Sequence, residues 1–340
     1  MATLLTMETA YFLSGDIGGT KTLLQLNSAG NEHAPTLKKS YASAAYTDLA
    51  EIVEDFLAEA GIRKISAACF ALAGPVNGSV VKLTNLPWVV DGDALAARCS
   101  LQRVVLINDF EAAGYGVAAL QAADVLTLQT GIEQAGGVRL VIGAGTGLGV
   151  ALLVWHEGRY QVYPSEAGHM DFAPADEMQS LLLRFLQQRH GHVSYERIVS
   201  GPGISAIFEF IHETGFASPS VQLIKAMDEG DAAAAISQFA LQGEEEIARM
   251  TMDLYLSVYG AFMGNMALAS LPRGGIYVAG GIAAKIFAQM QGGMFMNAFL
   301  SKGRFAQLLS TLPVRVVLNP EVGLLGANLY AQRYEKLLSI

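Results

Sequence analysis

Two glycine-rich turns carry residues that could bind phosphate. The first lies in DIGGTKT (16–22) and the second in GAGTGLG (143–149). Glycine lets backbone N–H groups approach an anion closely or adopt positive φ, and a threonine hydroxyl can donate to a phosphate oxygen. The candidate phosphate-binding residues are Gly18, Gly19 and Thr20 in the first turn, and Gly145, Thr146 and Gly147 in the second.

Known phosphate-binding patterns do not describe either turn. GAGTGLG lacks G-x-G-x-x-G spacing and is followed by an apolar, strand-like run, and Thr20 stands where the Walker pattern requires glycine before Lys21. One such turn by itself predicts a hairpin, whereas two matching turns favour phosphate binding. Asp16 beside the first turn could hold the Mg²⁺ of a polyphosphate, through water, because Mg²⁺ dehydrates reluctantly.

The same order of elements surrounds both turns. Alternating apolar runs at 11–15, 22–27 and 36–41 predict a three-stranded meander, and 139–163 predicts a second one. Helices and strands then alternate in each half, for example the amphipathic helix 49–60 with Asp48 as its cap and Glu51 as the capping-box partner. We therefore expect an α/β protein of two domains related by duplication.

The domain limits follow from where each half ends. The first half ends near residue 108, and the last helix, from about 322, is left over after the second repeat. We expect a small α/β domain of 1–108 plus about 322–340, and a large α/β domain of 109–321 with helical insertions. A polyphosphate ligand would lie in an active-site cleft between the domains, and the last helix would pack back on the first domain and close a hinge.

Composition excludes several classes of function. The 340 residues carry a formal net charge of −9 with no basic tract, which disfavours nucleic-acid binding. Only two cysteines occur, Cys69 and Cys99, and their spacing indicates neither a disulfide framework nor a zinc site. No apolar run reaches the roughly 20 residues of a membrane span. Charged residues Glu8 and Asp16 also lie where a signal peptide would be apolar, so we expect a cytoplasmic protein.

Three polar stretches allow more than one interpretation. Asn108-Asp109 follows a strand and begins a helix, and the dipeptide alone favours Asp109 as a helix cap. Glu166 and His169 have the Glu-x-x-His spacing of a metal pair on a helix, but Gly168 argues against a helix there. By itself His169 is equally compatible with a buried imidazole, and Glu196 with a solvated helix charge.

Several motifs together resemble the bacterial glucokinases, which belong to the sugar kinase, actin and heat-shock ATPase superfamily. DIGGTKT resembles the first phosphate motif, GAGTGLG the second and VAGGI (278–282) the adenosine motif. The further matching stretches are LTNLPW (83–88), INDFEAAGYG (107–116), EAGHMDF (166–172), GHVSYERIVSGPG (191–203) and NPEVGLLGA (319–327). Their order and number make the resemblance specific, and it covers the chain from about residue 12.

The resemblance implies two ribonuclease H-like domains and a transferase activity in the first step of glycolysis. It implies ATP and Mg²⁺ as cofactors, D-glucose phosphorylated at its 6-hydroxyl, Asp109 as the general base, and a homodimer. The residues that it assigns to the sugar are Asn85, Asn108, Asp109, Glu166, His169 and Glu196. Those that it assigns to the nucleotide are Asp16, Gly18, Gly19, Thr20, Lys21, Gly145, Thr146, Gly147, Gly280 and Gly281, with Asp16 holding Mg²⁺ through water.

Other functions remain open at this point. A kinase for another hexose, such as fructose or mannose, would carry similar motifs. A sugar-sensing regulator without turnover could keep the fold, although Asp16 and Asp109 argue against it, and an actin-like filament is disfavoured by the sugar motifs. The sequence also departs from the family at Lys21-Thr22, where many bacterial glucokinases have Asn-Ala.

Overall fold

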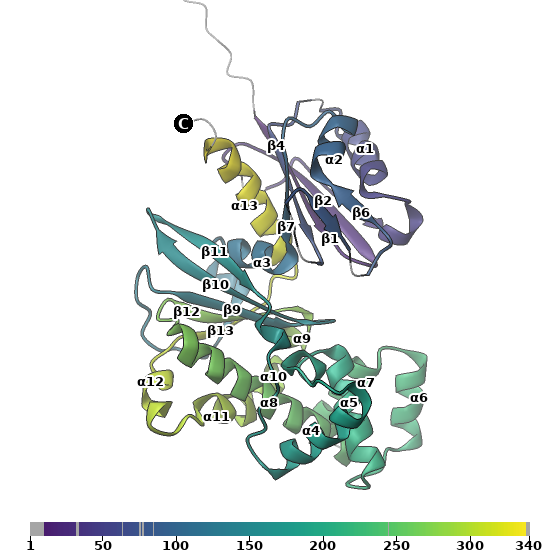
Figure 1. Cartoon of the computed structure of the whole chain (residues 1–340), viewed down its shortest axis with the longest axis vertical. Helices are drawn as coiled ribbons and strands as arrows, with labels where there is room; N and C mark the ends of the chain where they lie inside the picture. Colours follow the sequence, from purple (N-terminus) through teal and green to yellow (C-terminus); the bar gives the residue numbers. More distant parts are fainter. Residues whose placement is uncertain are drawn as a thin grey trace, which may run out of the picture. The chain divides into compact units, whose positions relative to one another are not determined.

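The computed structural model describes residues 10–31, 34–62, 64–74, 76, 78–83, 85–243 and 245–337. Contacts divide the chain into a first unit, Met1–Gln121 with Glu321–Ile340, and a second unit, Ala122–Pro320 (Figure 1). Residues 1–9 and 338–340 of the expected domains lie outside the described residues. The division falls after Gln121 and not after residue 108, because helix α3 (Asp109–Val117) packs on helix α13 (Val322–Leu337) of the first unit.

The first unit is built on a five-stranded sheet of order β3-β2-β1-β4-β7. β2 is antiparallel to both of its neighbours, whereas β1, β4 and β7 are parallel to one another. This is the strand order expected of a ribonuclease H-like domain. The strands are β1 (Tyr11–Ile17), β2 (Lys21–Ser28), β3 (Leu37–Ala42), β4 (Ala67–Leu72) and β7 (Val104–Asn108), with a separate hairpin of β5 (Val80–Lys82) and β6 (Val89–Asp91).

The two faces of this sheet bury different helices. Leu13 and Ile17 of β1 belong to a core with Ile52 and Phe56 of α1 (Leu49–Ala60), and α2 (Gly92–Arg98) lies on the same side (Figure 1). Helix α13 covers the opposite face, where it contacts β1, β4 and α3. Since side chains alternate along a strand, Asp16 points to the α13 face.

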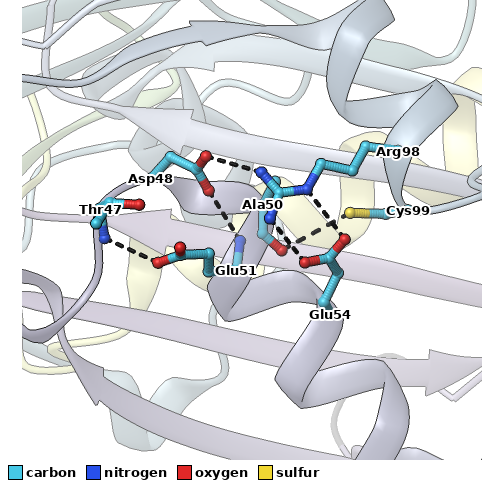
Figure 2. A network of polar contacts seen from close by, with 7 residues as sticks. All are labelled: Thr47, Asp48, Ala50, Glu51, Glu54, Arg98 and Cys99. Atoms are coloured by element: carbon cyan, nitrogen blue, oxygen red, sulfur yellow. Dashed lines mark hydrogen bonds and ion pairs between the residues drawn. The ribbon is translucent and has the colours of Figure 1, made fainter.

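Helix α1 begins where its capping residues predict. Asp48 Oδ1 accepts a hydrogen bond of 2.9 Å from the Glu51 N–H, and the Glu51 carboxylate accepts one from the Thr47 N–H (Figure 2). Arg98 at the end of α2 then bonds Asp48 and Glu54, at 2.8 Å each. The cap therefore starts α1 and also joins it to α2.

The second unit repeats the first sheet and extends it. Its order is β11-β10-β9-β12-β13-β8, so the first five strands reproduce the topology of the first unit and β8 adds an antiparallel edge. The expected duplication is therefore visible in the topology, whereas β8 was missed because only its pairing with β13 defines it. The strands are β8 (Val125–Gln129), β9 (Arg139–Ala144), β10 (Leu148–His156), β11 (Arg159–Ser165), β12 (Gly275–Ala279) and β13 (Val314–Val317).

Helices inserted after β11 and β12 enlarge the second unit and gather on one side of its sheet (Figure 1). The region 232–270 forms two helices, because Gly243 adopts φ 77° and ends the first of them. No helix of the described residues is both long and apolar enough to span a membrane. The helices are α4 (Glu177–His190), α5 (Gly201–Glu213), α6 (Val221–Glu229), α7 (Ala232–Gln242), α8 (Glu246–Ser270), α9 (Gly281–Lys285), α10 (Phe287–Gln291), α11 (Met294–Leu300) and α12 (Ala306–Ser310).

Short 3₁₀ turns complete the connections of both units. They are η1 (Ser43–Ala45) in the first unit, and η2 (Ala122–Asp124), η3 (Ala167–His169), η4 (Tyr195–Arg197) and η5 (Gly303–Phe305) in the second. His169 in η3 and Glu196 in η4 are two of the residues expected to bind the sugar.

Candidate active site

The first glycine turn connects β1 to β2 and is closed by a 3.0 Å hydrogen bond from the Gly18 N–H to the Lys21 carbonyl. A Cβ on Gly19 would lie 2.8 Å from Asn85 Cβ, so the glycine is required by the close approach of another chain segment. Thr20 and Lys21 are exposed at the tip. Asn85, which the family resemblance assigned to the sugar, thus lies beside the first phosphate turn.

Asp16 is half-buried at the end of β1. Burial, with a further contribution from the negative charge of Asp109, raises the pKa of the Asp16 carboxyl from 3.8 to about 6, while Lys21 opposes the change. A Cβ on Gly323, in the first turn of α13, would lie 3.4 Å from Asp16 Oδ2. The helix that follows the second unit in the chain therefore borders this carboxylate.

Asn108 caps helix α3, not Asp109 as the dipeptide alone favoured. Asn108 is the N-cap of α3: its Oδ1 accepts from the N–H groups of Phe110 at 2.8 Å and Glu111 at 3.3 Å, and its Nδ2 donates to the Gly74 carbonyl. Asp109 is the first helical residue, and its Oδ1 accepts from the Phe110 N–H. Asn108 caps the helix better because its backbone is extended, with φ −65° and ψ 148°.

The second glycine turn connects β9 to β10. The Gly145 N–H donates to the Gly147 carbonyl and the Gly201 N–H, at the start of α5, donates to the Gly145 carbonyl, each at 2.8 Å. Gly280 adopts φ 87°, and a Cβ there would lie 2.4 Å from the Ala144 carbonyl oxygen. The residues expected to bind nucleotide in this unit therefore meet at the ends of β9 and β12.

A cavity of about 700 Å³ opens beside this turn, and all of its lining residues belong to the second unit. Its size is that of a small-molecule site. Its walls come from the second turn, the start of α5, and the length of α7 and α9. The lining residues are Gly145, Thr146, Gly201, Pro202, Ile204, Ser205, Asp231, Ala232, Ala233, Ala234, Ser237, Gln238, Leu241, Gly281, Ile282, Lys285 and Ile286.

Three of the expected nucleotide residues, Gly145, Thr146 and Gly281, line the cavity. Gly147 and Gly280 lie beside them in the chain but do not line it. The wall formed by α7 was missed. Its residues, such as Ala233 and Gln238, belong to no phosphate motif, and the only local signal is Asp231, which caps α7 through the Ala234 N–H at 3.1 Å.

Glu166, His169 and Glu196 come together in the second unit. His169 Nε2 lies 4.0 Å from Glu166 Oε2, and His169 Nδ1 lies 3.9 Å from Glu196 Oε1. The side chains are 77%, 60% and 31% exposed for Glu166, His169 and Glu196, so they can reach a ligand and are not core residues. Two backbone hydrogen bonds, Phe172 N–H to Val193 and Tyr195 N–H to Met170, hold the two segments together.

The metal-pair interpretation of Glu166 and His169 is not supported. His169 ends the 3₁₀ turn η3, which Glu166 only precedes, so neither residue lies on an α-helix. In the part of the chain that the structure describes, no three His, Cys, Asp or Glu side chains are grouped to hold a metal ion. The cluster is suited to hydrogen-bonding a polar, uncharged ligand, to which carboxylates and an imidazole offer acceptors and a donor.

Comparison with known proteins identifies the family. The Glucokinase family model matches residues 13–334. The chain belongs to the glucokinase family. A glucokinase of Trichormus variabilis is 43% identical over 337 residues, which cover 94% of this chain and 98% of the relative. A glucokinase of Yersinia pestis is 35% identical over 325 residues, which cover 96% of this chain and 97% of the relative.

Solved structures of glucokinases agree with the fold. A glucokinase from an Antarctic psychrotroph matches with a TM-score of 0.83 at 28% identity, over 96% of this chain and all of that one. The Balamuthia mandrillaris glucokinase, solved with glucose, matches with a TM-score of 0.80 at 22% identity, over 98% of this chain and 96% of that one. The expected ribonuclease H-like α/β fold is confirmed, as is the resemblance to the glucokinase family.

Proposed function

We propose that this glucokinase-family chain transfers the γ-phosphoryl group of ATP to the 6-hydroxyl of D-glucose, with Asp109 as the general base. The observation that carries this proposal is the pairing of Asp16 with Asp109. Asp16 lies at the end of β1 beside a phosphate turn, Asp109 begins α3, and the charge of Asp109 raises the pKa of Asp16. A phosphoryl transfer needs these two functions, a cation-binding carboxylate and a base.

Asp109 acts on the proton of the nucleophile. As the sugar O6 forms its bond to the γ-phosphorus, the O6–H proton passes to the Asp109 carboxylate. The bond from the γ-phosphorus to the bridging oxygen breaks, and its electron pair leaves with ADP. The cap provided by Asn108 fixes the first turn of α3, so the base is held on a rigid element.

Asp16 fits a role in holding Mg²⁺. Among the described residues no hydrogen bond or ion pair satisfies its half-buried carboxylate, and a second carboxylate, Asp109, adds negative charge. A hydrated cation would relieve both costs, and one carboxylate with water and phosphate oxygens is the usual Mg²⁺ environment. When bound, Mg²⁺ would neutralise phosphate charge during transfer. Lys21 adds a fixed positive charge near Asp16.

We assign the nucleotide contacts by unit. In the second unit the cavity has the volume for adenosine, and Gly145, Thr146, Gly147, Gly280 and Gly281 would supply backbone and hydroxyl donors to it and to the phosphates. In the first unit the exposed tip of the glycine turn would bind phosphate. Its residues are Gly18, Gly19, Thr20 and Lys21.

The sugar contacts are assigned to Glu166, His169 and Glu196, with Asn85 and Asn108. Carboxylates accept hydrogen bonds from sugar hydroxyls, and a site of this kind rejects an analogue that lacks a hydroxyl because its polar groups are left unpaired. We therefore expect glucose to be preferred over its deoxy analogues and over fructose and mannose. A panel of these sugars at equal concentration, compared by kcat/KM, tests the assignment, and equal values for glucose and fructose would contradict it.

Membership of the family also supports a cytoplasmic homodimer that acts in the first step of glycolysis. Light scattering of the purified protein at several concentrations tests the dimer. A mass of one chain throughout would contradict it.

The decisive experiment is a coupled assay of glucose 6-phosphate formation by wild type and Asp109→Asn. Loss of the base should lower kcat by about 10²- to 10⁴-fold, while ADP still binds. Glu111→Gln is the matched control, because Glu111 is a half-buried carboxyl two residues further along the same helix. Glucose binding without turnover in wild type would instead support a sugar sensor, and equal losses in both variants would refute the role of Asp109.

A further inference from the structure

Leu148 contacts both sugar-binding segments of the second unit. Its N–H donates a 2.9 Å hydrogen bond to Glu196 Oε2. Its carbonyl oxygen lies so close to Gly168 that a Cβ there would be 2.1 Å away, and Gly168 precedes His169. Leu148 also follows Gly147 directly and begins β10. The end of the phosphate turn is therefore held by the residues assigned to the sugar.

Gly147 leaves room for the Glu196 carboxylate, which a side chain at this position would have to displace. A Cβ on Gly147 would lie 2.6 Å from Glu196 Oε2 and 3.4 Å from Cδ, and apart from the residues next to Gly147 in the chain no other described atom would lie within 4 Å. Its φ is not in the left-handed region, so backbone conformation does not demand glycine there. The side chain of Glu196 thus rests directly on the phosphate turn.

A second connection joins the same two segments. The Gly201 N–H donates to the Gly145 carbonyl at 2.8 Å, and the Ser200 hydroxyl donates to the Glu196 carbonyl at 2.8 Å. Ser200 also caps α5 by accepting from the Gly203 N–H at 3.1 Å. The segment from Glu196 to Gly201 is therefore attached to the turn at both of its ends, and Gly201 lines the cavity.

We propose that Glu196 positions the phosphate turn in addition to binding sugar, so that sugar and nucleotide strengthen each other's binding. The inference rests on the proposed function. Oε2 holds the Leu148 N–H, while Oε1 lies on the His169 side, 3.9 Å from Nδ1. A sugar hydroxyl bonded to Oε1 restrains rotation of the carboxylate and so keeps Oε2 on Leu148. Because coupling between two binding sites is reciprocal, bound nucleotide must favour sugar equally.

The test is calorimetric titration of ADP with Mg²⁺ into the full chain, with and without saturating glucose. In wild type, glucose should tighten ADP binding by about fivefold or more. Without glucose, Glu196→Ala should weaken ADP binding by about three- to tenfold, because the Leu148 N–H loses its partner. Glu196→Gln retains an oxygen that can accept from Leu148 and should keep the sugar-free ADP affinity. Circular dichroism establishes that each variant is folded.

Two further variants separate positioning from sugar binding. His169→Ala should lose glucose affinity but keep the sugar-free ADP affinity, since His169 makes no contact with Leu148 in the hydrogen bonds and ion pairs of the described residues. Gly147→Ala should weaken ADP binding in wild type, because its methyl displaces the carboxylate. In the Glu196→Ala background the same methyl should have little effect, since only Glu196 obstructs it.

The outcomes that overturn the inference are distinct from failure of the proposed function. Unchanged sugar-free ADP affinity in Glu196→Ala, or an equal effect of Gly147→Ala in both backgrounds, refutes the positioning role even if glucose is phosphorylated. ADP binding by wild type without any glucose phosphorylation refutes the proposed function, while the loss in Glu196→Ala would still support positioning. A wild-type protein that bound no ADP would overturn both.

Discussion

In the ligand-free protein, ionisation of Asp16 should lower the free energy of unfolding. The uncharged Asn of Asp16→Asn should remove that cost. The pKa of this carboxyl is raised from 3.8 to about 6, mainly by burial and next by the charge of Asp109. The folded state therefore holds the proton more tightly than the unfolded state, so stability should fall as the pH rises from about 4 to 6. A shift of this size corresponds to about 3 kcal/mol, lost fully above pH 6.

The assay is urea unfolding of wild type and Asp16→Asn between pH 4 and pH 8, without Mg²⁺ or nucleotide. Trp88 is 4% exposed and lies in the same unit as Asp16, whereas Trp155 is 46% exposed in the second unit. A Trp155→Phe background makes Trp88 the sole tryptophan, so its fluorescence follows the first unit. Replacing the Asp16 carboxyl by an amide also changes stability by an amount that does not depend on pH. This amount does not affect how the difference between the two proteins varies with pH.

The free energy of unfolding of Asp16→Asn minus that of wild type should rise from pH 4 to pH 6 and stay constant above pH 6. Asp93→Asn, which changes an exposed carboxyl on α2, should show no such rise. Asp109→Asn removes one cause of the raised Asp16 pKa, so in that background ionised Asp16 should cost the folded state less stability at neutral pH. A difference that is flat with pH, or that grows in favour of wild type, would refute the reasoning. Asp16→Asn should nevertheless lose phosphoryl transfer.

Three further predictions concern the elements that hold the site. Asp48→Ala should lower the free energy of unfolding by about 1 kcal/mol through loss of the α1 cap, measured by urea titration of Trp88 fluorescence; an unchanged midpoint would argue against the cap. Gly326→Ala should lower stability by about 3 kcal/mol or more, because its Cβ would lie 1.7 Å from the Ala112 carbonyl oxygen. The control Gly230→Ala, whose Cβ would lie 3.6 Å from the Ala226 carbonyl oxygen, should change thermal stability little. Ala233→Trp should fill part of the cavity and raise KM for ATP at least about tenfold with KM for glucose nearly unchanged; parallel changes in both constants would contradict a nucleotide role for the cavity.

Local chemistry explains why much of the fold was predictable. Asp48, Asp176 and Ser200 cap helices through N–H groups three residues later, a contact that sequence spacing alone specifies. Glu157 and Gly158 both adopt positive φ in the expected hairpin. The strand β8 and the break between α7 and α8 were less accessible, because each depends on contacts or backbone geometry that apolar periodicity does not encode.

The sequence proposed candidate site residues, but it could not give their burial, contacts or ionisation. The glycine turn pointed to Asp16 and the family resemblance to Asp109 and Glu196, but neither indicated the α7 wall of the cavity. The dipeptide alone favoured Asp109 as the cap of α3, whereas Asn108 caps this helix. The extended backbone of Asn108 is the reason.

By itself, then, the sequence determined which side chains could do the chemistry. It also determined the two glycine turns, the repeated meanders and the helix starts, because these depend on interactions among neighbouring residues. Only the tertiary structure decided the raised pKa of Asp16, the approach of Gly323 to that carboxylate and the hold of Glu196 on Leu148. Desolvation and contacts between distant segments depend on how the elements pack, and no spacing along the chain records that packing.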